Sequence, residues 1–199
     1  MNYYLIKNTV DHALFESEGQ LYPIFEEKYG REAINVKKEE LVEITNKEDI
    51  EALNKYLKPY EDNKPKIYMA GPLFNEGDRY TNQINSDILR KNGFTTFLLQ
   101  DIVITNNSSP LVKSACFYMD FKAIKECDYL LANCNGIDID SGTAAEIGLA
   151  YGLNKNIILY KSDVRNYYNN TYKLNNFVGG LVDNIVYSSI EEILDLLLK

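Results

Sequence analysis

With 199 residues, 45% of them hydrophobic, the chain is long enough to bury a full α/β core, and we expect one main domain with an appendage. Its formal net charge of −8 and the absence of a Lys/Arg cluster argue against nucleic acid as a partner and against a basic membrane-binding face. The three cysteines and the single histidine lack the spacing of a disulfide framework or a metal site, and no apolar run approaches the roughly 18 residues of a membrane span, so we expect a cytoplasmic protein.

The first 62 residues carry a pattern of their own. A β-like start covers Tyr3–Lys7, and a polar helix is expected at Asn46–Leu57, because an N-cap residue is followed there by acids in the first turn. The polar run Glu61–Pro65 ends in proline and is typical of a linker. We therefore predict a small α+β appendage of unknown role at residues 1–62 and a second domain at residues 63–199.

From Lys66 onward, short apolar runs alternate with helical patterns. Strands are predicted at Ile67–Gly71, Thr95–Leu99, Tyr129–Asn133, Ile157–Tyr160 and Ile185–Tyr187. Helices are predicted at Arg79–Asn92, Cys116–Glu126, Thr143–Leu153 and Ile190–Leu198. This alternation indicates an α/β fold, a five-stranded parallel sheet with helices on both faces. We expect the flavodoxin-like or Rossmann-like strand order 2-1-3-4-5, with a ligand cleft where the first and third strands end.

The third predicted strand leads into an acidic loop and a helix start rich in small residues. The helix start reads Asp140-Ser-Gly-Thr-Ala-Ala-Glu146. Strand, turn and helix in this order bring loop residues to the carboxyl edge of a parallel sheet, where α/β enzymes bind ligands. Two carboxylates, Asp140 and Glu146, are therefore expected on one side of one turn, and the loop Pro72–Asp78 should face them across the ligand.

Neither loop carries the glycine pattern of a nucleotide-binding site. GxGxxG and GxxxxGK[ST] are both absent, so a dinucleotide or ATP site is not expected. Serine and cysteine nucleophiles lack support, because His12 lies in the appendage and nothing there pairs with it as a base. What remains is a group of carboxylates around the third predicted strand: Asp120, Asp128, Asp138, Asp140 and Glu146.

Carboxylates grouped near a cleft are suited to glycosidic chemistry. One of them attacks or stabilises the sugar cation, and another handles the proton of the leaving group. Other interpretations stay open at this point. Thr143-x-x-Glu146 also fits a capping box, in which Glu146 only reaches back to the Thr143 amide, and Asp120 also fits an ordinary acid at a helix start. The pair Asp138 and Asp140 lacks the further oxygen ligands of a recognisable cation site.

At these residues the sequence resembles the nucleoside 2-deoxyribosyltransferase family, over about residues 65 to 199. The resemblance rests on Ile67–Phe74, Phe97–Asp101, Asp120 with Ala123–Asp128, Asp140–Tyr151 and Leu174–Gly180. Its most specific part is the Asp-x-Gly-x-x-x-Glu helix start that follows the Tyr-x-Ala-Gly-Pro-Leu-Phe loop. The first 62 or so residues show no such resemblance.

The resemblance implies catalytic roles for three residues. Glu146 corresponds to the family's nucleophile, which attacks C1′ of a 2′-deoxynucleoside and holds the 2-deoxyribosyl group as an ester. Asp120 corresponds to the acid that assists protonation of the departing base, and Tyr68 to the tyrosine that orients the nucleophile. Tyr68 and Phe74 also fit core positions, as most aromatic residues on sheet strands do.

The resemblance also implies a set of substrate-binding residues. Asp140 corresponds to the acid that binds the 5′-hydroxyl of the sugar, and Gln100 lies where the family has polar contacts to the base. Asn175 corresponds to an asparagine that a neighbouring subunit inserts beside the sugar, although the family commonly has Asn-x-Met where this chain has Asn175-Asn-Phe177. The predicted substrate-binding residues are Asp140, Gly71, Phe74, Gln100, Gly142, Asn175 and Phe177.

The implied function is transfer of 2-deoxyribose between nucleobases through a covalent glycosyl-glutamate intermediate, as part of nucleoside salvage. No cofactor and no metal are expected, because a deoxyribosyl cation lacks the 2′-hydroxyl and forms more easily. The implied partners are a deoxynucleoside and a free nucleobase, either purine or pyrimidine. A homo-oligomer, either a dimer or an assembly of dimers, follows if Asn175 acts on a neighbouring subunit's site.

Two other functions fit the same residues. An N-glycosidase would hydrolyse deoxynucleosides or deoxynucleoside 5′-monophosphates with water as the acceptor. Asp140 would repel a 5′-phosphate dianion unless Arg79 or Arg165 folds into the cleft, so a free nucleoside is favoured. The second alternative is a non-catalytic nucleotide-sensing domain, with residues 1–62 as its partner-binding module, which would bind a nucleoside without turnover.

Overall fold

The computed structural model describes residues 2–60, 62–102, 107–165 and 174–199. The chain forms two compact units. The N-terminal unit consists of Met1–Pro59 with Ile102–Lys122, and the C-terminal unit of Tyr60–Asp101 with Ala123–Lys199. Residues 102–122 thus group with the N-terminal unit, although they lie within the domain predicted at residues 63–199. The assignment of the domains to residues 1–62 and 63–199 stays a prediction.

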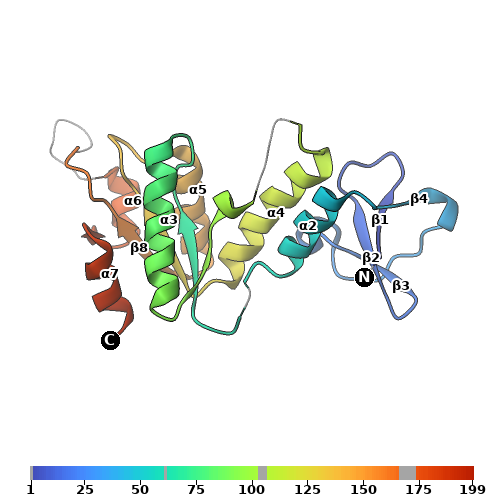
Figure 1. Cartoon of the computed structure of the whole chain (residues 1–199), viewed down its shortest axis with the longest axis horizontal. Helices are drawn as coiled ribbons and strands as arrows, with labels where there is room; N and C mark the ends of the chain where they lie inside the picture. Colours follow the sequence, from blue (N-terminus) through green and yellow to red (C-terminus); the bar gives the residue numbers. More distant parts are fainter. Residues whose placement is uncertain (1, 61, 103–106, 166–173) are drawn as a thin grey trace. The chain divides into compact units, whose positions relative to one another are not determined.

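The N-terminal unit contains a four-stranded antiparallel sheet with the order β3-β2-β1-β4 (Figure 1). Its strands are β1 Tyr3–Ile6, β2 Ala13–Ser17, β3 Gln20–Pro23 and β4 Leu41–Glu43. Tyr3 lies opposite Phe15, which in turn lies opposite Tyr22, so these three aromatic residues share one face of the sheet. The β-like start predicted at residues 3–7 is confirmed, whereas the sequence pattern does not predict the other three strands.

Short helices complete the N-terminal unit. They are α1 Glu26–Tyr29, the 3₁₀ helix η1 Lys38–Glu40, α2 Lys47–Leu57 and the first part of α4 Pro110–Glu126. Asn46 caps α2 as predicted, because its side chain accepts a 3.2 Å hydrogen bond from the Asp49 amide. Phe25 packs edge-on against Tyr56 and stacks on Tyr118 of α4, with ring centroids 5.0 and 4.7 Å apart.

The C-terminal unit contains a five-stranded, all-parallel sheet with the order β6-β5-β7-β8-β9. Its strands are β5 Lys66–Ala70, β6 Thr95–Phe97, β7 Tyr129–Asn133, β8 Asn156–Tyr160 and β9 Val186–Tyr187. Numbered from the first strand of this sheet, the order is 2-1-3-4-5, as the sequence predicts. The helices that cover the sheet are α3 Glu76–Lys91, α5 Ser141–Gly152, α6 Asn176–Gly180 and α7 Ile190–Leu197, and the 3₁₀ helix η2 is Leu99–Asp101.

Side chains of the sheet alternate between two packed faces. Ile67 and Met69 of β5 belong to a hydrophobic cluster that also contains Leu89 of α3 and Ile193 of α7. Tyr68 lies between Ile67 and Met69, so its side chain points to the opposite face. Because both faces are covered, the central strands are buried along almost their whole length, as expected for a parallel sheet.

Two helices differ from the sequence-based expectation. The helix predicted from Cys116 already begins at Pro110, because proline has no amide hydrogen to satisfy in the first turn and its fixed φ suits a helix start. The five-residue helix α6 is not predicted from the sequence at all. Over the described ranges of the chain, none of the helices combines the length and the apolar composition that a membrane crossing requires.

Candidate active site

The candidate site lies at the carboxyl edge of the parallel sheet, between β5 and β7. These neighbouring strands run in the same direction, and β5 leads into α3 while β7 leads into α5. From β5 the chain continues to β6 on one side of the sheet, and from β7 to β8 on the other, so the loops after β5 and β7 leave toward opposite faces. The space between such loops is where α/β folds bind ligands.

A tyrosine of β5 holds the glutamate of α5. The hydroxyl of Tyr68 donates a 2.6 Å hydrogen bond to Oε1 of Glu146. The Tyr68 side chain is only 1% exposed, and its ring stacks on Phe97 of β6 with centroids 5.5 Å apart. Core packing therefore fixes the ring, and the ring's hydroxyl fixes the half-buried Glu146 carboxylate. The two interpretations of Tyr68, as a core residue and as the partner of the glutamate, both apply.

Asp140, and not Thr143, caps helix α5. Oδ2 of Asp140 accepts hydrogen bonds from the amide of Thr143 at 3.0 Å and from its hydroxyl at 3.2 Å. The capping-box interpretation of Glu146 is therefore wrong, because Thr143 lies inside the helix and its amide is bonded to Asp140. A Cβ atom at Gly142 would lie 3.0 Å from Oδ2 of Asp140, so the glycine leaves room for this carboxylate.

The model of the nucleoside 2-deoxyribosyltransferase family matches residues 67–196, which is more than half of the chain. The chain belongs to this family. Family membership identifies an enzyme that acts on N-glycosidic bonds, by deoxyribosyl transfer or by hydrolysis. The matched segment contains β5, the Tyr68–Glu146 pair and the start of α5.

Solved structures show the same fold. A conserved protein from Enterococcus faecalis V583 is 26% identical, with 67% of this chain and 96% of that chain covered and a TM-score of 0.54. A 2-deoxyribosyltransferase from the psychrotolerant bacterium Bacillus psychrosaccharolyticus is 24% identical, with 64% and 89% covered and a TM-score of 0.53. At that identity the second likeness is evidence for the fold alone. No curated protein matches the chain.

Two buried asparagines fix the start of the loop after β5. The side chain of Asn133, at the end of β7, donates a 2.7 Å hydrogen bond to Oδ1 of Asn82, and Asn82 donates to the Pro72 carbonyl at 3.0 Å. A Cβ atom at Gly71 would lie 3.0 Å from the Asn82 amide atoms, so a larger residue there would require these neighbours to shift. Gly71 thus allows a close approach of chain segments, and its contact with the substrate stays a prediction. The sequence pattern does not predict this pair, although a polar residue at the end of the apolar strand β7 is a usable signal.

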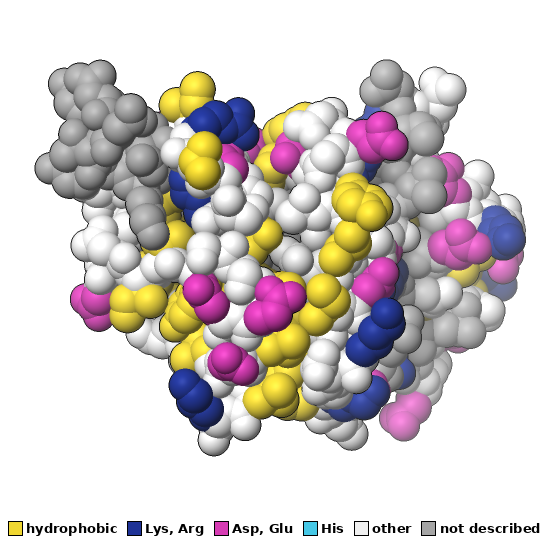
Figure 2. Space-filling view, turned by 60° about the vertical axis from the view of Figure 1, so that its left-hand side comes forward, with side chains coloured by type: hydrophobic (Ala, Val, Ile, Leu, Met, Phe, Trp, Pro, Cys, Tyr) yellow, Lys and Arg dark blue, Asp and Glu magenta, His cyan; other side chains and the backbone are white. Residues whose placement is uncertain are grey.

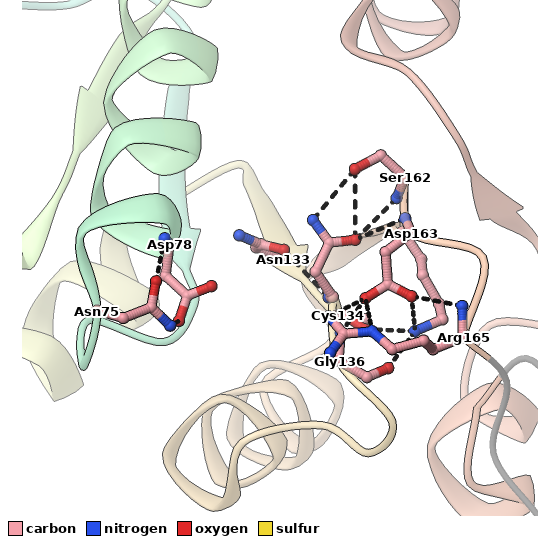
Figure 3. A network of polar contacts seen from close by, with 10 residues as sticks. Asn75, Asp78, Asn133, Cys134, Gly136, Ser162, Asp163 and Arg165 are labelled. Carbon is pink, nitrogen blue, oxygen red and sulfur yellow. Dashed lines mark hydrogen bonds and ion pairs between the residues drawn. The ribbon is translucent and has the colours of Figure 1, made fainter.

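The same loop leads into a capped helix. Asn75 caps α3, with Oδ1 accepting a 2.9 Å hydrogen bond from the Asp78 amide and Nδ2 donating to the Asp78 carboxylate (Figure 3). Phe74 lies just before this cap and is 81% exposed. The core interpretation of Phe74 is therefore wrong, and its ring is accessible for contact with a ligand.

Gln100 lies in η2, directly after β6. Its Nε2 donates hydrogen bonds to the Arg79 carbonyl at 3.0 Å and to Oε1 of Gln83 at 3.3 Å. Both partners are acceptors, so the Gln100 nitrogen, which donates, must face them and the Gln100 oxygen must point away. Its Oε1 is buried and has no hydrogen-bond partner in the described part of the chain. An unpartnered buried acceptor suits a residue that a ligand satisfies with a hydrogen-bond donor.

The remaining predicted site residues lie on other elements. Asn175 caps α6 by accepting a 2.9 Å hydrogen bond from the Phe177 amide, and Phe177 is 77% exposed. Asp120 is half-buried in the part of α4 that belongs to the N-terminal unit. Its predicted position beside the base stays a prediction, as does the action of Asn175 on a neighbouring subunit.

Cysteine does not compete with Glu146 as the nucleophile. Burial raises the pKa of Cys116 and Cys127 to about 11, with the charge of Asp120 adding to the effect at Cys116. Burial likewise raises the pKa of Cys134 to about 12. These thiols therefore carry almost no thiolate near neutral pH, and the thiolate is the reactive form.

Proposed function

We propose that the chain transfers a 2-deoxyribosyl group from a 2′-deoxynucleoside to a free nucleobase, with Glu146 as the nucleophile. The observation that carries this proposal is the 2.6 Å hydrogen bond from the buried Tyr68 hydroxyl to the Glu146 carboxylate. A carboxylate held at the ligand-binding edge of the sheet by a packed tyrosine is oriented for attack, as covalent catalysis requires.

The reaction consists of two displacements at C1′. In the first, a Glu146 oxygen bonds to C1′ while the bond from C1′ to the base nitrogen breaks, and the base takes the bonding electrons together with a proton from Asp120. In the second, a nitrogen of the incoming base bonds to C1′, the ester bond breaks, and Asp120 receives the proton of that nitrogen. Two inversions restore the original β configuration. Asp140 accepts a hydrogen bond from the 5′-hydroxyl.

Charges at the site favour a free nucleoside over a 5′-monophosphate. A phosphate at the 5′ position would meet the carboxylate of Asp140. The two arginines that could offset this repulsion have other partners: Arg79 donates to the Leu73 carbonyl at 2.8 Å, and Arg165 pairs with Asp163 at 2.7 Å. A phosphate-binding arrangement would require at least one of them to break its contact.

Product analysis tests the proposal. Purified protein given deoxyinosine and adenine should form deoxyadenosine, whereas release of only hypoxanthine and deoxyribose would establish hydrolysis in place of transfer. Glu146→Gln should remove both activities, because the amide is not a nucleophile. Glu192→Gln is the matched control, since Glu192 lies on α7, where it bonds to Ser188, and its loss should leave turnover unchanged. Binding of deoxyinosine without any product would indicate a nucleotide-sensing role.

Transfer between free nucleosides and bases would serve nucleoside salvage in the cytoplasm. The reaction as proposed uses only side chains of the protein, so we expect full activity in the presence of a metal chelator. A loss of activity that added metal restores would contradict this mechanism.

A further inference from the structure

A charged network joins the loop after β7 to the loop after β8 (Figure 3). Lys161 and Asp163 follow directly on β8, and both contact the backbone of Gly136 in the loop that leads to Asp140. The Gly136 amide donates a 2.6 Å hydrogen bond to Oδ2 of Asp163, and the Lys161 ammonium donates a 2.5 Å hydrogen bond to the Gly136 carbonyl. Both the amide and the carbonyl of Gly136 are thus held by side chains that follow β8.

The surroundings of Lys161 make this arrangement specific. Its side chain is only 2% exposed, and its three N–H groups meet three acceptors: the carbonyls of Cys134 and Gly136 and, at 3.5 Å, the carboxylate of Asp163. A buried ammonium is costly unless all its hydrogens are satisfied, so the loop backbone and the lysine fix each other's positions.

A second contact runs beside the charged one. Oδ1 of Asn135 accepts hydrogen bonds from the amides of Ser162 at 2.8 Å and Asp163 at 3.1 Å. Gly136 has φ of +119°, and a Cβ atom there would lie 3.0 Å from the Asp138 carbonyl, so the loop folds back on itself directly after the held segment. The loop therefore turns sharply at Gly136 on its way to Asp140.

We propose that Lys161 and Asp163 are positioning residues that set the place of Asp140 and thereby the affinity for the 5′-hydroxyl of the substrate. Neither residue is proposed to contact the substrate. They hold Gly136, Gly136 fixes the path of the loop, and the loop delivers Asp140 to its position as the cap of α5. The inference rests on the proposed function, in which Asp140 binds the 5′-hydroxyl.

Comparison of two substrates isolates this effect. Asp163→Asn keeps the size of the side chain but removes the charge that pairs with Lys161. With 2′-deoxyadenosine as donor, we expect KM to rise about 10-fold while kcat changes by less than about 2-fold, because Asp140 contacts a part of the substrate remote from C1′. With 2′,5′-dideoxyadenosine, which has no 5′-hydroxyl to bind, wild type and variant should have the same KM.

Three results would overturn the inference: an equal rise of KM for both donors, an unchanged KM for 2′-deoxyadenosine, or a loss confined to kcat. Glu192→Gln is the control, since it removes an exposed carboxylate of the same unit that bonds to Ser188. If Asp163→Asn does not fold, Asn135→Ala is measured in the same way, because it removes the parallel contact and leaves the ion pair intact. Failure of the proposed function is distinguishable, since wild-type protein would then form no new nucleoside from either donor when a free acceptor base is supplied.

Discussion

At the scale of single residues, Tyr68 connects the core to the chemistry. A tyrosine that is almost completely buried usually has a hydrogen-bond partner for its hydroxyl, as Tyr60 has in the Ala123 carbonyl at 2.9 Å. The Tyr68 hydroxyl instead bonds to a half-buried carboxylate. Because stacking on Phe97 keeps the Tyr68 ring in one orientation, its hydroxyl limits the orientations of the Glu146 carboxylate. A limited range of orientations is what an attacking carboxylate needs.

Tyr68→Phe should therefore reduce turnover without unfolding the protein. The phenylalanine ring can keep the stack on Phe97, and only the hydrogen bond to Glu146 is lost. A hydrogen bond to a charged group contributes about 1.5–3 kcal/mol, which corresponds to roughly 10- to 100-fold in kcat. Tyr60→Phe is the matched control and should cost about 1 kcal/mol of stability with unchanged kcat. Equal kinetic constants for Tyr68→Phe and wild type would remove Tyr68 from the mechanism.

Asp140 has two roles that substitution can separate. As the N-cap of α5 it stabilises the helix, and as a carboxylate it is proposed to bind the 5′-hydroxyl and to reject a 5′-phosphate. Asn caps helices about as well as Asp, so Asp140→Asn should keep the melting temperature, whereas Asp140→Ala should lose about 1 kcal/mol of stability. Both variants should accept deoxyadenosine 5′-monophosphate better than wild type does. An unchanged preference in both, measured as the ratio of kcat/KM values, would mean that Asp140 does not face the 5′ position.

At the scale of elements, the sequence determines the sheet far better than the polar contacts around it. Regular alternation of apolar runs and helical patterns, together with the handedness of crossovers, leaves few possible strand orders, and the predicted order is the observed one. Helix caps are less certain from sequence alone, because Asp140 and Thr143 both fit the pattern and only the hydrogen bonds distinguish them. The pairing of Asn82 with Asn133 joins positions far apart in the sequence, which local pattern cannot predict.

The loop after β8 makes the stability of the fold depend on pH. Burial raises the pKa of Asp163, but hydrogen bonds from Arg165 and the Gly136 amide and the charge of Lys161 outweigh it and lower the pKa from 3.8 to about 2. A lowered pKa in the folded state means that the carboxylate stabilises the fold above about pH 4 and that this contribution is lost as the pH falls through 2. The shift corresponds to at most about 2 kcal/mol, reduced by the solvent exposure of Arg165.

Unfolding measurements on wild type and Asp163→Asn check this contribution. The difference in unfolding free energy between them should be constant from about pH 5 to pH 7 and should shrink by about half at pH 3, where the unfolded-state carboxyl is mostly protonated. A difference that does not vary with pH would show that the charge of Asp163 makes no net contribution. Glu192→Gln again serves as the comparison, measured over the same pH range.

At the scale of the whole molecule, helix α4 gives the N-terminal residues a structural role. Within the N-terminal unit, Tyr118 of α4 stacks on Phe25, and Lys122 donates to the Leu57 carbonyl and lies 4.6 Å from the centre of the Tyr56 ring. The family model begins only at residue 67, yet these contacts to α4 come from residues before it. The part of α4 that carries Asp120 therefore depends on residues outside the family match for its packing.

Exposed hydrophobic residues of the C-terminal unit line a groove on its surface. A groove of about 450 Å³ is lined in part by Tyr151, Val182, Ile185 and Leu196, and Tyr151 and Ile185 are each 55% exposed. In the space-filling view, hydrophobic side chains group together on the drawn face with acidic side chains among them (Figure 2). Patches of this kind are typical of contact surfaces, and assembly is a requirement of the proposed role of Asn175.

Mixing two inactive variants tests whether Asn175 acts on a neighbouring subunit. Asn175→Ala and Glu146→Ala should each have little activity alone. In a mixture of equal amounts, refolded together, half of the dimers contain one subunit of each kind, and each of these has one complete site if Asn175 acts in trans. About a quarter of the wild-type rate should then return. If Asn175 acts within its own subunit, every site in the mixture carries one defect, and the mixture should stay as inactive as its components.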